Sequence, residues 1–95
     1  MPAYLISTIE IHDPHGYEEY KKLVPPVLDK YGGRFVVRGG GIEYKEGDWR
    51  PKRVVVVEFE SMAKARAFYD SPEYTQAKLI RQRTSAGNVV FVEGI

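Results

Sequence analysis

The chain has 95 residues, no cysteine, and 14 basic against 13 acidic side chains. This length suits one domain, and the lack of cysteine excludes disulfides, thiolate metal sites and thiol nucleophiles. Because the charges nearly cancel and form no block, the composition argues against a general nucleic-acid binder. No run approaches the roughly 18 apolar residues of a membrane helix, and no secretory signal pattern is present. We therefore expect a cytoplasmic protein with no membrane or nucleic-acid partner.

The chain is expected to open with a strand over Ala3–Ile11, in which neither alternating set of side chains is polar. A helix should follow, because Asp13 can cap it and Pro14 suits its first position. Apolar side chains then recur at helical spacing as far as Tyr31. Since prolines lack the amide hydrogen that a helix interior uses, Pro25-Pro26 predicts a kink or a break just before it.

The middle of the chain predicts a hairpin. Gly32-Gly33 supplies a helix cap and a turn, and Arg34–Arg38 has the apolar character of a second strand. The glycines at 39–41 predict a β-bulge, after which strand character would resume at Ile42–Lys45. Residues 46–48 are typical of a turn that leads antiparallel into the next strand.

The central strand is expected over Arg53–Glu60, which contains four consecutive valines and a phenylalanine. Such a β-branched apolar run is typical of a strand buried on both faces. Ser61 can cap the helix that follows. A second helical segment should begin at Ser71-Pro72, because serine caps and proline suits the first position. We expect this segment to end at Gly87 and a last strand over Asn88–Glu93.

This order of elements predicts a ferredoxin-like βαββαβ fold, an α+β domain with a four-stranded antiparallel sheet, helices on one face and a split second helix. The other face of the sheet would carry Ile6, Val54 and Val56. Because water should not cover so apolar a surface, we expect a second copy to stack its own sheet there. The pattern therefore predicts a homodimer.

Five segments of the chain carry a resemblance to a known family: Tyr31–Gly40, Val55–Phe59, Ala65–Tyr74, Arg81 and Val92–Gly94. With matching spacing over nearly the whole length, they resemble the domain of unknown function 1330 family. That resemblance implies membership of the dimeric α/β-barrel superfamily, in which two ferredoxin-like subunits pair their sheets. The superfamily includes cofactor-independent oxygenases, haem-degrading enzymes, isomerising enzymes and non-enzymatic ligand binders, so the fold leaves the function open.

Arg38, followed by Gly39 and Gly40, is the first candidate for a ligand site. Glycines allow a ligand to approach the backbone, and a guanidinium can grip a carboxylate through two hydrogen bonds. The simpler interpretation is a β-bulge in which Arg38 pairs with Glu58 or Glu60. The loop has neither of the glycine spacings that cradle phosphates.

His12 is a candidate acid or base, because the usual pKa of histidine lies near neutrality. His12 and His15 together form only a weak metal pattern, since no third ligand accompanies them; we expect no metal and no cofactor. Trp49, the single tryptophan, lies beside the predicted turn, where an exposed or dimer-edge position is expected rather than a catalytic one.

Four further side chains on the predicted helices could line a pocket between the helices and the sheet: Tyr17, Tyr20, Tyr74 and Arg81. Core packing and a surface ion pair are the simpler explanation of the same residues. The leading hypothesis is a cofactor-free homodimer that binds a small polar or aromatic acid through Arg38. As an enzyme it would use His12 or a tyrosine for proton transfer or oxygen chemistry. The alternative is a non-catalytic dimer that binds a metabolite or a protein.

Overall fold

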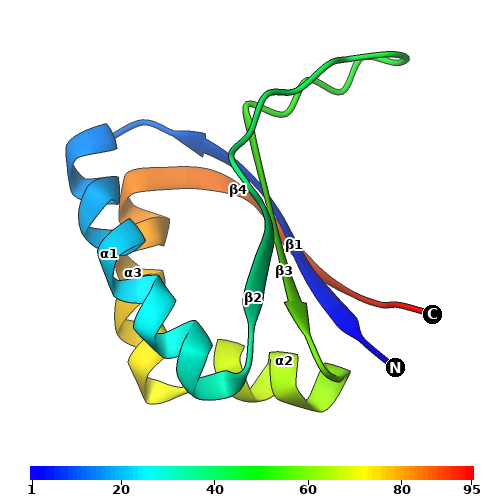
Figure 1. Cartoon of the computed structure of the whole chain (residues 1–95). Coiled ribbons are helices and arrows are strands. Elements are labelled where there is room, and N and C mark those ends of the chain that lie inside the picture. The colour runs from blue at the N-terminus through cyan, green and yellow to red at the C-terminus, as the bar shows by residue number, and fades with distance from the viewer.

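The strands and helices of the chain follow the predicted ferredoxin-like order. The computed structural model describes all of residues 1–95, and its four strands form one antiparallel sheet in the order β2-β3-β1-β4. Figure 1 shows the helices gathered on one side of this sheet. None of the helices is long and apolar enough to cross a membrane. The elements are β1 (Ala3–Ile11), α1 (Pro14–Tyr31), β2 (Arg34–Arg38), β3 (Arg53–Phe59), α2 (Met62–Tyr69), α3 (Pro72–Thr84) and β4 (Ser85–Glu93).

The hydrophobic core lies between the helices and the sheet face that they cover. Along β1 the odd-numbered residues from Ala3 to Ile9 are buried, and the pairing of Leu5 with Val57 brings β1 and β3 side chains onto the same face. Each such side chain stabilises the fold by roughly 1.5–3 kcal/mol when fully buried. The core contains these buried residues: Ala3, Leu5, Ile9, Tyr17, Val24, Leu28, Val55, Val57, Phe59, Ala65, Phe68, Tyr74 and Ala77.

The opposite face of the sheet has no covering helix (Figure 1). The strand register aligns four aliphatic residues, one from each strand, in the row Val37–Val56–Ile6–Val90. We call this row and its surroundings the open sheet face. Val90 is 52% exposed and Val37 is 38% exposed. The predicted two-sided apolar character of the sheet is therefore confirmed.

Helix α1 runs through Pro25-Pro26 without interruption, so the predicted break is wrong. Asp13 caps its start by accepting a hydrogen bond from the Gly16 amide at 3.1 Å, and buried side chains on both sides of the prolines hold the helix to the sheet. Because Pro25 has no amide hydrogen, the carbonyl of Lys21 loses its partner within the helix. Arg38 of β2 supplies a substitute donor, its Nη2 lying 3.4 Å from this carbonyl oxygen.

We expect Pro25→Ala to stabilise the protein, by about 1–2 kcal/mol, since alanine removes the ring clash and restores the amide donor to Lys21. Urea denaturation measures the change. A double-mutant cycle provides the control: Arg38→Met should cost less in the Pro25→Ala background than in the wild type, because the carbonyl no longer needs Arg38. Equal costs in both backgrounds would contradict this role of Arg38.

The segment between β2 and β3 differs from the prediction, since residues 40–52 form no strand. The chain instead forms an extended arm that projects beyond the sheet (Figure 1). The Tyr44 hydroxyl donates to the Pro51 carbonyl at 2.6 Å and holds the two sides of the arm together. The β-bulge lies at Val36 and not at the glycines. At Gly39 the backbone has φ +71°, which turns the chain out of the ladder.

The last helix ends earlier than predicted, because α3 stops at Thr84 and β4 already begins at Ser85. Gly87 therefore lies within β4, opposite Ile9. A Cβ atom at this position would come within 1.9 Å of the Thr8 carbonyl oxygen. The glycine thus allows two strands to approach closely and does not end a helix.

Candidate functional site

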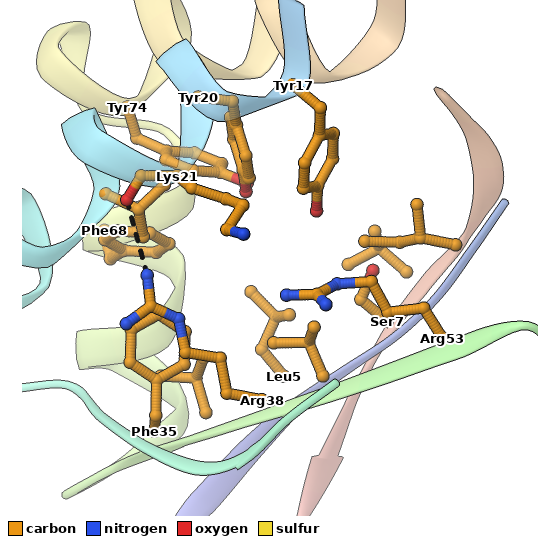
Figure 2. Close-up of a pocket in the computed structure, with 15 residues that line it drawn as sticks. Leu5, Ser7, Tyr17, Tyr20, Lys21, Phe35, Arg38, Arg53, Phe68 and Tyr74 are labelled. Atoms are coloured by element: carbon orange, nitrogen blue, oxygen red, sulfur yellow. Dashed lines mark hydrogen bonds between the residues drawn. The ribbon is translucent and has the colours of Figure 1, made fainter. Parts of the chain in front are cut away.

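A pocket lies between α1 and the covered face of the sheet, closed at one end by α2 and α3. It encloses about 520 Å³ when the solvent-open space at its mouth is included. Figure 2 shows the side chains around this space. The lining residues are Leu5, Ser7, Ile9, Tyr17, Tyr20, Lys21, Val24, Phe35, Arg38, Arg53, Val55, Val57, Phe68, Tyr74 and Val89.

The charges around the pocket are all positive. Lys21, Arg38 and Arg53 line it, and no aspartate or glutamate does. Lys21 is paired outside the pocket with Glu18 at 3.1 Å. Arg38 donates to the Lys21 carbonyl and lies over the Phe35 ring, 4.3 Å from its centre. Arg53 forms no ion pair, so its charge has no counterpart within the protein.

Arg53 begins β3, and its guanidinium lies 5.8 Å from the centre of the Tyr17 ring. A Cβ atom at Gly39 would lie 2.0 Å from Nη1 of Arg53, so any other residue there would displace this guanidinium from its present position. The Nε atom of Arg53 is buried without a hydrogen-bond partner, and so is the Oγ atom of Ser7 on β1. Figure 2 shows Ser7, Arg53 and the Tyr17 hydroxyl around one end of the pocket.

Two tyrosine hydroxyls meet at the other end of the pocket, where Tyr20 and Tyr74 share a hydrogen bond of 2.7 Å. Burial raises the pKa of the Tyr20 hydroxyl well above its usual value of 10.0, and the neighbouring Tyr74 adds to the rise. Burial likewise raises the pKa of Tyr17. These hydroxyls therefore stay protonated at neutral pH and can donate hydrogen bonds to a ligand.

Because the pKa of Tyr20 is raised, the free energy of unfolding should depend on pH in the alkaline range. Above pH 10.0 the unfolded chain loses the Tyr20 proton while the folded protein keeps it, so the free energy of unfolding should fall as the pH rises. Tyr20→Phe should make this fall shallower, which urea denaturation between pH 9 and pH 11 measures. Below pH 9 the two proteins should keep a constant difference in stability. A fall as steep in Tyr20→Phe as in the wild type would contradict the assignment.

The structure brings together Tyr17, Tyr20, Tyr74 and Arg38, four of the side chains that the sequence suggested as ligand-binding residues. Arg81 does not line the pocket; it lies on α3, is 8% exposed, and its charge partly offsets the rise that burial causes in the pKa of Tyr20. The remaining candidates, His12, Gly39 and Gly40, do not line the pocket either. His12 is exposed, and its amide donates to the Thr84 carbonyl at 3.0 Å.

The expected pairing of Arg38 with Glu58 or Glu60 is wrong. Arg38 lies opposite Val55 in the sheet, so its side chain belongs to the helix-covered face. Glu58 belongs to the open sheet face, where it pairs with Arg34 and accepts a hydrogen bond from Tyr4 at 3.2 Å. Trp49 lies in the arm and is 68% exposed.

Sequence reasoning missed Ser7, Lys21 and Arg53. Two of them, Ser7 and Arg53, could have been found from the alternation of buried and exposed side chains along the strands. Ser7 shares its parity with the buried Leu5 and Ile9, and Arg53 shares its parity with Val55 and Val57. A polar residue at a core position of each strand therefore pointed to a site on the covered face.

The fold and the pocket define an α+β protein of the ferredoxin-like class with a cationic pocket under its helices. A family model described as a domain of unknown function (DUF1330) matches residues 2–95, and the chain belongs to this family. The resemblance inferred from the sequence is thereby confirmed. A comparison with curated proteins gives no match.

Several solved structures share the fold at low sequence identity. A protein of unknown function from Rhodopseudomonas palustris is 18% identical, with a TM-score of 0.75 over 99% of this chain and 82% of that one. SnoaB, a cofactor-independent oxygenase from Streptomyces nogalater, is 13% identical, with a TM-score of 0.71 over 99% and 93%. A dimeric ferredoxin-like protein of unknown function from Jannaschia sp. CCS1 is 14% identical, with a TM-score of 0.70 over 99% and 100%. These identities establish likeness of fold alone.

Proposed function

We propose that the chain forms a homodimer through its open sheet face and binds a small, largely apolar acid in the pocket beneath α1. One observation carries the ligand class: the pocket has three cationic side chains and no carboxylate among its lining residues. Eleven of its 15 lining residues are hydrophobic. An apolar body with one anionic group complements such a lining.

The electrostatic argument concerns the half-buried guanidinium of Arg53, whose Nε atom is buried without a hydrogen-bond partner. Burying a polar atom costs free energy unless it is hydrogen-bonded. Arg53 has no anionic partner in the protein and faces the pocket, so a carboxylate there would gain a charge-assisted hydrogen bond. A neutral molecule of the same shape would leave the guanidinium without its partner.

The row Val37–Val56–Ile6–Val90, which no element of the chain covers, supports the proposed dimer. Stacking two such sheets buries both rows, and the hydrophobic effect stabilises the contact. The similar protein from Jannaschia sp. is described as dimeric and ferredoxin-like, which supports the same assembly here.

The likeness to SnoaB supports cofactor-independent chemistry as a further possibility for this pocket. Of the proton-transfer candidates that the sequence suggested, His12 or a tyrosine, only tyrosines line the pocket, where the Tyr20–Tyr74 hydroxyl pair would serve as a hydrogen-bond donor to the substrate. A non-catalytic binder would use the same residues to hold its ligand. Both forms of the proposal require that an acid binds here.

Isothermal titration with benzoate and benzamide tests the ligand class, because the two probes have nearly the same shape and differ in charge. We expect benzoate to bind at least about tenfold more tightly, the equivalent of about 1.4 kcal/mol. The preference should weaken at high salt. Equal affinities, or a preference for benzamide, would contradict an acid as the ligand.

A further inference from the structure

We infer that the carboxylate of this ligand binds at the end of the pocket formed by Arg53 and Ser7, and that Arg38 is not the residue that holds it. The inference rests on the proposed acid-binding function and assigns the anion to a particular part of the pocket. Neither Arg53 nor Ser7 is among the ligand-binding residues that the sequence suggested.

The first argument comes from hydrogen-bonding capacity. Nearly all buried polar atoms in proteins have a partner, and each exception needs an explanation. Ser7 is 4% exposed, and its Oγ atom has no partner; the Nε atom of Arg53 is likewise buried and unpartnered. Both residues line the pocket. A carboxylate has two acceptor oxygens, so one ligand group can satisfy the Ser7 hydroxyl and the Arg53 guanidinium together.

The second argument comes from the strand register. Ser7 pairs with Val55, and Arg53 pairs with Ile9, so the two residues are diagonal neighbours on β1 and β3. Their side chains lie on the helix-covered face, because both strands keep this parity for their core residues. Diagonal neighbours are about 7–8 Å apart at their backbones, close enough for a long side chain to reach a shared ligand. The sheet thus fixes the spacing of the two groups.

The third argument is that the other two cations are already engaged. Arg38 donates to the Lys21 carbonyl that Pro25 leaves without a helical partner, and it is an exposed residue. Lys21 pairs with Glu18. Binding a ligand through Arg38 would cost its hydrogen bond and binding through Lys21 its ion pair, whereas the buried Nε atom of Arg53 has no hydrogen-bond partner to give up. The anion should therefore bind where an unused donor faces the pocket.

The lack of a side chain at Gly39 is consistent with assigning the carboxylate to Arg53. A side chain at residue 39 would overlap the Arg53 guanidinium, whose Nη1 atom lies 2.0 Å from the position of such a Cβ. The glycine next to Arg38 therefore makes room for Arg53. The position of Gly39 directly after Arg38 in the sequence is thus explained by the space that Arg53 needs. Gly39 itself makes no contact with the ligand.

The test compares benzoate binding to the wild type and to three variants by isothermal titration. We expect Arg53→Met to weaken binding about 10- to 100-fold, the range for losing a hydrogen bond to a charged group. Ser7→Ala should weaken it less, about 3- to 10-fold. Arg38→Met, which removes the same charge from the same pocket, should weaken binding clearly less than Arg53→Met does. Arg53→Lys should recover part of the loss, since it restores the charge without the planar fork.

A second measurement needs no variant and covers the case in which Arg53→Met does not fold. In the wild type, benzoate should shift the ¹⁵N–¹H resonance of the Arg53 Nε group more than that of Arg38, and benzamide should shift it less than benzoate does. If Arg38→Met abolishes binding while Arg53→Met does not, the inference is wrong and the acid-binding function still stands. If the wild type does not prefer benzoate to benzamide, both are wrong.

Discussion

Replacing Phe68 by alanine is expected to lower the free energy of unfolding by about 3–5 kcal/mol, the range for removing a buried aromatic side chain. Phe68 is 1% exposed, and its ring centre lies 4.3 Å from that of Tyr74 and 5.4 Å from that of Phe59. These neighbours come from β3 and α3, so they cannot collapse readily into the space that the ring leaves. Small domains have total stabilities of only about 5–15 kcal/mol, so the loss should be obvious.

Urea denaturation followed by circular dichroism measures this loss. Leu79→Ala is the matched control, since it removes an apolar side chain from α3 that is 56% exposed. It should change stability by less than about 0.5 kcal/mol. A loss below about 1 kcal/mol for Phe68→Ala would show that the helices do not pack on the sheet as described.

The second large effect concerns the open sheet face. We expect Val90→Lys to dissociate the proposed dimer, because two-fold symmetry would place an unpaired charge at two points of one apolar interface. With several kcal/mol lost for each buried charge, the dissociation constant should rise by more than about 100-fold. Val90 is already 52% exposed in a single chain, so the monomer itself should still fold.

Sedimentation velocity at micromolar concentrations distinguishes the two states. The control is Leu79→Lys, which makes a comparable substitution at a side chain that is 56% exposed on the helical side. It should leave the dimer intact. A Val90→Lys protein that remains as dimeric as the wild type would show that the open sheet face is not the interface.

The strands were predictable because their alternation reports burial directly. Apolar residues occur among the even positions of β1 and β3, at Ile6, Val54 and Val56, as well as among the odd ones, and the structure leaves the even set without a covering helix. Helix α1 shows where such reasoning stops. The local rule for Pro25-Pro26 predicts a break, but the buried Tyr17 and Leu28 on either side hold the helix together. The donor that compensates, Arg38, comes from a different element.

The arm between β2 and β3 was mistaken for strand for a related reason. Residues 42–45 have suitable side chains, but a strand also needs a partner at the right register. The turn at Gly39, with φ +71°, carries the chain away from the sheet before that pairing can form. Single side-chain contacts such as that of Tyr44 with Pro51 then fix the arm. Sequence periodicity contains no information on such contacts.

The candidate site could be predicted only in part. The tyrosines on α1 and α3 were found because they repeat at helical spacing and face the core. Arg53 was missed because it looked like the polar end of an apolar strand. Its position in the pocket depends on pairing with Ile9 and on the space beside Gly39, which only the folded chain reveals.

The most direct test of the central claim is to locate a bound acid by isotope-filtered nuclear Overhauser spectroscopy on the wild-type protein with benzoate. We expect contacts from the benzoate ring protons to Tyr17, Leu5 and Val55, which line the pocket beneath α1. Contacts confined to Val37 and Val90 on the open sheet face would contradict the claim that this pocket is the binding site.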